Sequence, residues 1–113
     1  MSLRDKVLAL VDVKYETIPA ASLPGWDEDV RVRSMSSRER DVFESAYAKD
    51  PGDNTVARAV AFCLIDDQGG RIFEDKDIAA LGAKHPANLR TVYHVAMKLS
   101  KVEKDATDTA EKN

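Results

Sequence analysis

The segment from Val56 to Ile65 constrains the fold more than any other part of this 113-residue chain, because Arg58 is its only charged residue. A helix that is apolar nearly all round has to be covered on every side by the rest of a domain. Its longest unbroken apolar run, Ala59–Ile65, is seven residues long, whereas a membrane-spanning helix needs about 20. We therefore predict a core helix from Thr55 to about Ile65 and no contact with a membrane.

Length and composition are those of one folded domain. Domains typically have about 100–150 residues, and a chain of this length buries about two-thirds of its surface on folding. With 43% hydrophobic and 33% charged residues, the composition is that of a soluble globular protein. The stretch 101–113 contains Val102 and two alanines as its only apolar residues. We predict a single domain over residues 1–100 and a disordered, flexible polar tail over 101–113.

Capping residues and breaks in periodicity divide the rest of the domain into further helices. Ser36 and Glu39 have the spacing of a capping box at the start of a helix that runs to about Lys49. The apolar residues of the other segments recur with helical spacing. We predict four to five helices, over residues 2–11, 36–49, 55–65, 75–82 and 86–100. In the helix that Ser36 begins, the expected buried stripe consists of Val42, Phe43, Ala46 and Tyr47.

Residues 14–33 favour β structure. Tyr15, Thr17 and Ile18 are strand-forming residues, and the sequence alternates apolar and cationic side chains from Val30 onward. Two strands alone are barely stable in water, so they need helices behind them or a third strand from a partner. The predicted fold class is α+β, mostly α, with the helices packed on a small N-terminal two-stranded β element.

No arrangement of residues in the sequence predicts catalysis, a cofactor or a metal site. An EF-hand loop starting at Asp66 needs glycine at position 6 and glutamate at position 12, where this chain has Arg71 and Asp77. His85 and His94 lack the further ligands that zinc requires. We expect no enzymatic activity, no cofactor and no metal.

The lone cysteine, Cys63, gives no sign of catalysis either. It lies near the C-terminal end of the apolar helix, where nothing lowers the pKa of a thiol. We expect it to be buried and inert, in a protein that stays in a reducing cytoplasm.

A basic stretch supports an alternative function. Four arginines, at positions 31, 33, 38 and 40, lie within ten residues of a chain whose net charge is −3. DNA-binding faces usually belong to basic domains, so nucleic acid is not the partner we expect. A small helical DNA-binding regulator that uses the Arg31–Arg40 patch remains the alternative. The same cations also suit acidic surfaces on a partner copy, such as residues 27–29.

Trp26 lies in a polar loop, between Pro24-Gly25 and three consecutive acidic residues. One interpretation is that the loop folds back and Trp26 covers part of the core. The other is that Trp26 is an exposed anchor at a protein interface, where tryptophan is enriched among the residues that contribute most to binding. The sequence leaves both interpretations open.

The order of several motifs along the chain resembles that of a known family. The chain begins Met-Ser-Leu-Arg-Asp-Lys and continues with Pro-Gly-Trp, Val-Arg-Val-Arg and Met-Ser-Ser-Arg-Glu-Arg-Asp-Val-Phe-Glu. Then follow Cys-Leu-Ile-Asp-Asp-Gln-Gly-Gly-Arg-Ile-Phe and Glu-Asp-Lys-Asp-Ile-Ala-Ala-Leu-Gly. Over about residues 2–100 the chain resembles the small tail assembly chaperones of long-tailed, non-contractile bacteriophages and their prophages. The resemblance lies in the order and spacing of these motifs.

The resemblance implies a non-enzymatic assembly factor in the cytoplasm of the host bacterium. Such chaperones coat the tape-measure protein before tail-tube subunits polymerise around it, and they are absent from the mature virion. Many are also made in a longer, frameshifted form whose extension contacts the tail-tube protein. The final residues Lys112-Asn113 can be encoded as AAA-AAC, a run on which ribosomes slip, so a frameshift near this point is one hypothesis.

A reversible coat needs small modules with apolar surface outside the core, and we also expect weak self-association. For the first helix, the alternative is plain packing in the core. The candidate partner-binding residues are Leu3, Val7, Leu10, Trp26, Arg31 and Arg33.

Overall fold

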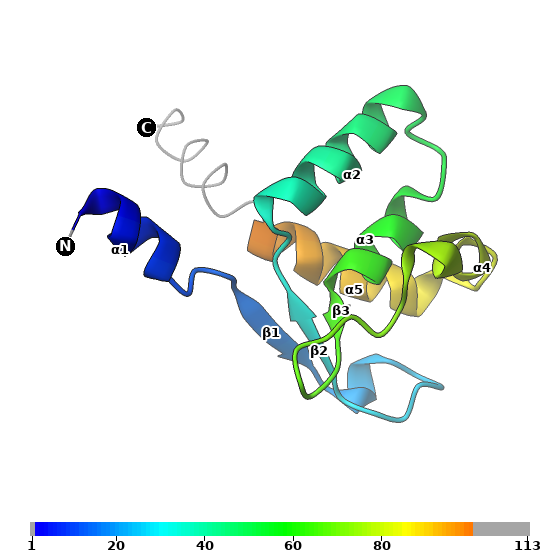
Figure 1. Cartoon of the computed structure of the whole chain (residues 1–113). Helices are drawn as coiled ribbons and strands as arrows, with labels where there is room; N and C mark the ends of the chain where they lie inside the picture. The colour runs from blue at the N-terminus through cyan, green and yellow to red at the C-terminus, as the bar shows by residue number, and fades with distance from the viewer. Residues whose placement is uncertain (1, 101–113) are drawn as a thin grey trace, which may run out of the picture.

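A computed structural model of the chain describes residues 2–100 and confirms an α+β fold that is mostly α (Figure 1). The predicted tail, 101–113, and the hypothesis at Lys112-Asn113 lie outside the described residues. The α-helices of the described part are α1 (Leu3–Ala9), α2 (Ser37–Lys49), α3 (Thr55–Cys63), α4 (Ile78–Gly82) and α5 (Pro86–Ser100). The strands are β1 (Tyr15–Ile18), β2 (Val30–Arg33) and β3 (Leu64–Ile65), and two short 3-10 helices are η1 (Ala20–Ser22) and η2 (Asp75–Asp77). Within residues 2–100, every helix is too short or too polar to cross a membrane.

The three strands form one antiparallel sheet in the order β1-β2-β3, where the sequence predicted two strands. Glu16 lies opposite Val32 on the β1–β2 side, and Val32 lies opposite Leu64 on the β2–β3 side. The predicted core helix therefore ends at Cys63, two residues earlier than expected. Leu64 and Ile65 are both buried, and by pairing with β2 their backbone gains the hydrogen bonds that a further helical turn would have given.

Helix α3 is the centre of the core, as its composition predicted. Six of its nine residues are buried, and α2, α4 and α5 all pack against it. The N-terminal part of the predicted 75–82 helix is the 3-10 turn η2, which also contacts α3. Helix α5 packs on β1 and β2 as well as on α3, and an ion pair from Lys98 Nζ to Glu16 Oε1 (2.7 Å) joins it to the first strand.

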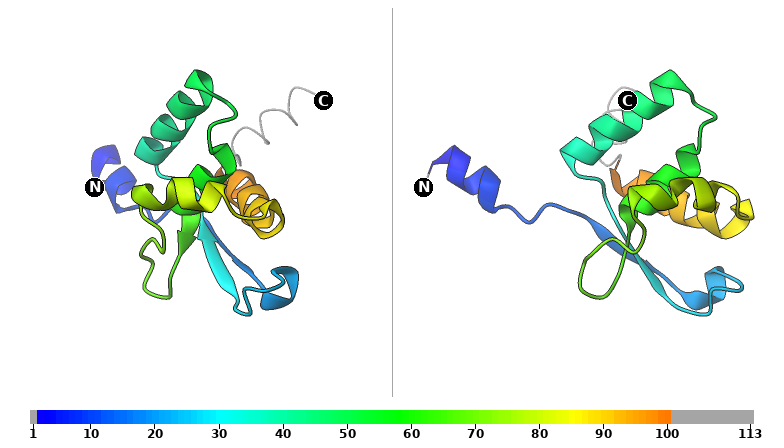
Figure 2. Two further views of the ribbon diagram at one scale, coloured as in Figure 1. Left: turned by 90° about the vertical axis from the view of Figure 1, so that its right-hand side faces the viewer. Right: turned by 45° about the vertical axis from the view of Figure 1, so that its right-hand side comes forward.

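The buried stripe predicted for α2 is wrong in part. Phe43 is buried, but Val42 and Tyr47 are about half exposed. In both Figure 1 and Figure 2, α2 runs outward from the body with one side toward α3. Because α2 contacts the body along only one side, fewer of its residues are buried than its amphipathic pattern predicts.

Helix α1 stands apart from the body (Figures 1 and 2). Ser2 caps it, because its Oγ accepts a hydrogen bond from the Asp5 N–H (3.1 Å), and the helix ends at Ala9 rather than at residue 11. All seven of its residues are exposed. Plain packing in the core, which was the alternative for this helix, is therefore wrong: the domain buries its centre without using α1.

The position of α1 leads to a stability prediction. In dilute solution, the double substitution Leu3→Ser with Val7→Ser should change the free energy of unfolding by less than about 0.5 kcal/mol, as surface substitutions do. Leu64→Ala, at a buried position of β3, should cost about 2–5 kcal/mol. Urea denaturation followed by circular dichroism measures both. A loss above 1.5 kcal/mol from the α1 double substitution would show that α1 packs on its own domain, since Leu64→Ala gives the scale for a core position.

Candidate partner-binding surface

The described chain leaves nine large apolar side chains exposed, and five of them lie between residues 3 and 11. Their exposed fractions run from 52% at Val7 to 90% at Val11. At 100° per residue, Leu3, Val7 and Leu10 share one face of α1 and its C-cap, and the cations Arg4 and Lys6 flank that face. The other two exposed apolar residues of this group are Leu8 and Val11. An apolar surface of this kind, concentrated in one segment, is typical of a binding site.

The segment that follows α1 is held at the end of the sheet. The backbone carbonyl of Lys14 accepts a hydrogen bond from the Ser34 N–H (2.8 Å), and the Lys14 N–H donates to Ser34 Oγ (3.0 Å). Ser34 is buried. These two bonds extend the β1–β2 ladder to Lys14, so the arm, defined as residues 2–13, leaves the end of the sheet in a set direction.

The loop that carries Trp26 is held at several points. Leu23 is fully buried, and its carbonyl accepts a hydrogen bond from the Trp26 N–H (3.1 Å). Gly25 has a φ of 87°, a conformation that glycine adopts without steric cost. The side-chain amide of Asn88, at the start of α5, donates to the Pro24 carbonyl (2.8 Å). The position of Trp26 is thus fixed by the loop and not by its own burial.

Of the two interpretations of Trp26, the structure confirms packing against the core. It packs against the core while remaining partly exposed. It also lines an open pocket of about 630 Å³ with a mainly apolar lining. We call this the Trp26 pocket; its lining includes Pro24, Trp26, Phe73, Leu81, Lys84 and Leu89.

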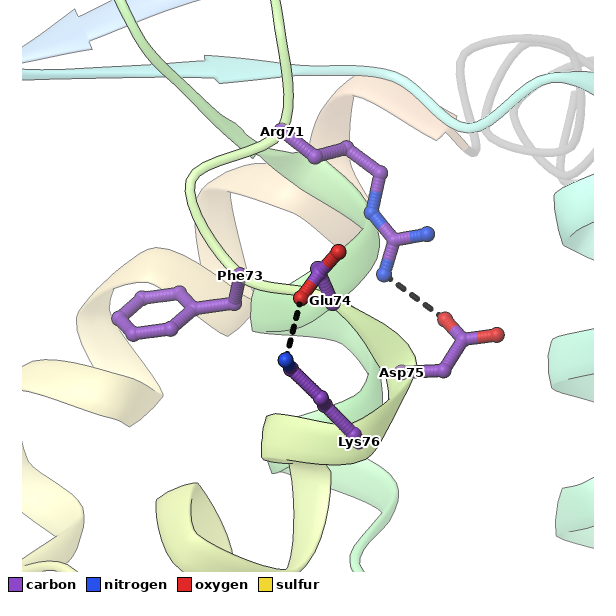
Figure 3. Close-up of a pocket in the computed structure, with 5 residues that line it drawn as sticks. All are labelled: Arg71, Phe73, Glu74, Asp75 and Lys76. Atoms are coloured by element: carbon purple, nitrogen blue, oxygen red, sulfur yellow. Dashed lines mark hydrogen bonds and ion pairs between the residues drawn. The ribbon is translucent and has the colours of Figure 1, made fainter.

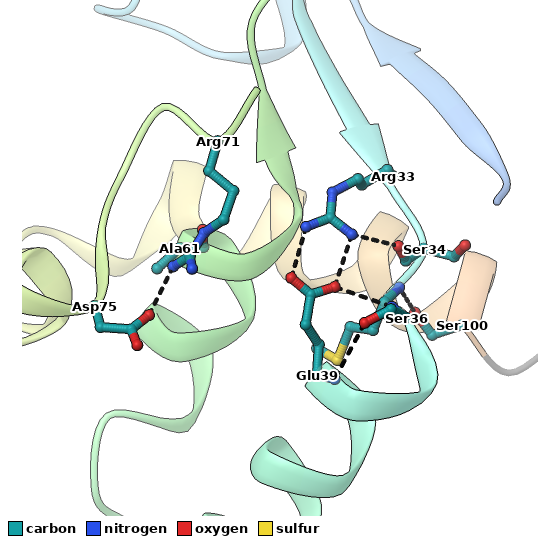
Figure 4. Close-up of polar contacts among 9 residues, drawn as sticks. Arg33, Ser34, Ser36, Glu39, Ala61, Arg71, Asp75 and Ser100 are labelled. Atoms are coloured by element: carbon teal, nitrogen blue, oxygen red, sulfur yellow. Dashed lines mark hydrogen bonds and ion pairs between the residues drawn. The ribbon is translucent and has the colours of Figure 1, made fainter. Parts of the chain in front are cut away.

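Arg33 is engaged inside the fold. Its two terminal nitrogens donate to the two carboxylate oxygens of Glu39 at 2.7 and 2.6 Å, and both side chains are mostly buried, at 15% and 19% exposure (Figure 4). Glu39 also accepts a hydrogen bond from the Ser36 N–H (2.9 Å), which completes the predicted capping box of α2. Arg33 therefore joins the end of β2 to the start of α2.

This pair shifts the pKa of both groups. Burial by itself raises the pKa of Glu39, but the hydrogen bonds from Arg33 and Ser36 outweigh it and hold that pKa below its usual value. The hydrogen bond to Glu39 raises the pKa of Arg33 further. Both groups stay charged at neutral pH.

The other arginines of the basic stretch differ in their contacts. Arg40 pairs with Glu44 (2.7 Å) and donates to the Ser100 carbonyl (2.6 Å). Arg31 lies on the outer face of the sheet with its guanidinium 5.2 Å from the centre of the Tyr15 ring. Of the four, two are thus occupied in holding α2 and α5 in place, which weakens the patch that a DNA-binding face would use.

A second, more polar pocket of about 430 Å³ lies around η2 (Figure 3). Its charges pair with one another: Arg71 Nη2 lies 2.9 Å from Asp75 Oδ1, and Lys76 Nζ lies 3.1 Å from Glu74 Oε2. Phe73 points away from these pairs in Figure 3. These ion pairs hold the turn together, and the four charged side chains that line this pocket are all paired.

Cys63 is buried at the end of α3, and burial raises the pKa of its thiol to about 12. The thiol therefore stays protonated at neutral pH. Among residues 2–100, no three His, Cys, Asp or Glu side chains come together in a way that could hold a metal ion.

Comparison with known proteins adds a structural relative. No protein-family model matches the sequence, and no curated protein shows significant sequence similarity. Among solved structures, the bacteriophage HK97 tail assembly chaperone matches with a TM-score of 0.61 and 16% sequence identity, over 87% of this chain and 98% of that one. The chain has the fold of this chaperone. Because the match extends over nearly all of both chains, the family resemblance seen in the sequence is confirmed at the level of the fold.

The chaperone fold separates the candidate residues. Leu3, Val7 and Leu10 lie on α1 and its C-cap, Trp26 lies beside the start of α5, and Arg31 lies in β2 against the ring of Tyr15. Leu8 and Val11 are not among the predicted candidates but extend the apolar surface of the arm, and both belong to the same hydrophobic run of the sequence. The pocket walls formed by Phe73, Leu81 and Leu89 were not predicted either, because they come from separate segments and carry no local signal.

The Arg33–Glu39 pair yields a pH prediction. Because the folded-state pKa of Glu39 is lowered, its stabilisation is complete above its unfolded pKa of about 4.3 and is lost as the pH falls through the folded value. Glu39→Gln should therefore reduce stability by about 1–3 kcal/mol at pH 7, and the difference should shrink below about pH 4.

Glu44→Gln is the matched control, since Glu44 forms an exposed pair with Arg40 on the same helix and should lose less than about 1 kcal/mol. Denaturation curves between pH 3 and pH 7 measure both variants. A Glu39→Gln deficit that stays constant down to pH 3 would contradict the assignment.

Proposed function

We propose that this chain is a phage tail assembly chaperone, a non-enzymatic binding protein that covers the tape-measure protein during tail assembly. The observation that supports this most is the match to the HK97 tail assembly chaperone over nearly the full length of both chains. The motif order over residues 2–100 supports the same function independently of the structure.

The exposed arm gives the proposal a physical basis. A tape-measure protein is long, helical and apolar along stripes, so a protein that keeps it soluble has to offer apolar surface that its own core does not need. Helix α1 offers such a surface, with its apolar side chains exposed and its position held by the Lys14–Ser34 bonds. Helix against helix or helix in groove is the usual mode for contacts of this kind.

The remaining parts of the proposal follow the family. We propose that the chain acts in the cytoplasm of the host bacterium and is absent from the mature virion. The tail-tube protein is proposed as a second partner, contacted through a longer frameshifted form.

The alternative, a DNA-binding regulator, has less support from the fold. Arg33 is bound by Glu39 and Arg40 by Glu44 and Ser100, which leaves Arg31 and Arg38 of the four. A DNA-binding regulator would bind duplex DNA with an affinity that falls steeply as salt rises. Fluorescence anisotropy with labelled DNA at 50 and 200 mM salt should show no such binding, and a steep salt slope would favour the regulator.

Co-expression with the tape-measure protein of the same phage genome tests the proposal. The wild-type chain should keep the tape-measure protein soluble and co-purify with it. Val7→Asp, which places a charge in the apolar face of the arm, should reduce the co-purified amount at least tenfold while the circular dichroism spectrum stays native.

Val42→Asp is the matched control, because Val42 is about as exposed as Val7 but lies on α2. It should behave as wild type. If the wild-type chain neither solubilises nor retains the tape-measure protein, the proposed function is wrong.

A further inference from the structure

The sheet has an open edge at β1. In the order β1-β2-β3, strand β2 covers one side of β1, and within residues 2–100 no strand lies on its other side (Figure 1). The outer edge of β3 differs, because the Ile72 N–H donates to the Leu64 carbonyl (3.2 Å) and Ile65 forms a β-bridge with Arg71. The edge of β1 is therefore the place where a further strand can join this sheet.

The backbone groups along this edge are unused. The bond from the Ser34 N–H to the Lys14 carbonyl (2.8 Å) marks these two residues as a hydrogen-bonded pair, and such pairs alternate along an antiparallel ladder. Glu16 is the next residue of β1 that bonds to β2, whereas Tyr15 and Thr17 turn their N–H and C=O groups away from it. Among residues 2–100, no hydrogen bond from outside the sheet reaches these groups. An exposed edge of this kind is a template for pairing with another chain.

We propose that the β1 edges of two copies of this chain pair antiparallel about a two-fold axis, so that their sheets join into one. The contact uses the same surface on both copies, so it closes at a dimer. It goes beyond the proposed function, which assigns α1 to the client and gives the sheet edge no role. Because neither α1 nor the client takes part, the purified chain alone is enough to test it.

Charge selects one register for this pairing. Three registers pair most of the edge, with Lys14, Tyr15 or Glu16 on the two-fold axis. Lys14 or Glu16 on the axis lies directly opposite the same residue of the second copy, and like charges in that position are destabilising. With Tyr15 on the axis, each Lys14 lies opposite Glu16 of the other copy. A larger shift brings Pro19 into the ladder, and proline has no N–H to donate.

The side chains on both faces of the sheet suit the register with Tyr15 on the axis. Lys14 and Glu16 share the face that α5 covers, since Glu16 Oε1 lies 2.7 Å from Lys98 Nζ. Within residues 2–100, Lys14 forms no ion pair of its own. Tyr15 is about half exposed on the opposite face, where it would meet Tyr15 of the second copy. Opposite charges and aromatic pairs are the cross-strand contacts that stabilise a ladder.

The contact is short and therefore weak. It joins the edge groups of Tyr15, Thr17 and the next outward-facing residue, Val13, and buries less than the roughly 1,200 Å² of a stable interface. Association should therefore rise with protein concentration. Because the paired strands are antiparallel, the two arms leave the joined sheet at opposite ends. A dimer can thus hold a long client at two points, which raises its overall affinity above that of one arm.

Sedimentation velocity with two charge variants tests the proposal. Lys14→Glu places carboxylates opposite each other and Glu16→Lys places ammonium groups opposite each other, so each variant alone should associate at least tenfold more weakly than the wild type. Mixed in equal amounts, the two variants should form a one-to-one dimer, because every cross-strand pair then joins opposite charges. Lys49→Glu, the same charge change at an exposed position of α2, should associate as the wild type does.

A proline substitution tests the ladder itself. Thr17→Pro removes an N–H that faces away from β2, so the circular dichroism spectrum should stay native while the dimer is lost. In the wild type, the amides of Tyr15 and Thr17 should exchange at least tenfold more slowly at concentrations where the dimer forms than in dilute solution. Val7→Asp should leave this protection unchanged, since α1 takes no part in the contact.

The charge mixture keeps the test decisive if Thr17→Pro fails to fold. The proposal is overturned if the wild type is monomeric at all concentrations, or if folded Thr17→Pro associates normally. It is also overturned if the mixture of charge variants associates no better than either variant alone, or if Val7→Asp removes the protection of Tyr15 and Thr17. Failure to bind the tape-measure protein, with this dimer intact, would count against the proposed function alone.

Discussion

The structure depends on the need to cover α3. This helix is apolar on nearly every side, and the elements that pack on it, α2, α4, α5 and η2, each cover part of its surface. Once those elements are in place, the core is complete with the residues after Tyr15. The arm is left outside because the core is formed without it. Helix α1 is thus exposed because the rest of the chain buries the core without it.

Polar contacts join the elements that surround the core to one another. The bidentate Arg33–Glu39 pair joins β2 to α2, Lys98 joins α5 to β1, and Ser34 holds the root of the arm at Lys14. Arg33, which the sequence suggested as a candidate for partner binding, is one of the side chains that make these contacts. An arginine in a strand that alternates with valines can be either a surface cation or an internal clamp, and the choice depends on a carboxylate six residues later, across a turn.

The sequence was informative wherever the signal is local. The absence of charge from α3, the capping box at Ser36 and Glu39, and the chaperone-like motif order all predicted what the structure contains. It failed where burial depends on neighbours that are distant in the chain. The α2 stripe was expected to be buried and is half exposed, Leu64 and Ile65 became a third strand, and the Trp26 pocket is assembled from three segments. An amphipathic pattern says that a face can be buried, and tertiary structure decides whether it is and against which molecule.

The central claim is that α1 is stabilised by another molecule and not by its own domain. Amide hydrogen exchange at a series of protein concentrations tests this most directly, because protection reports local stability residue by residue. The amides of α1 should exchange rapidly in dilute solution and become protected as the concentration rises, while those of α3 stay protected throughout. Protection of α1 that is already complete at the lowest concentration and does not change would contradict the claim.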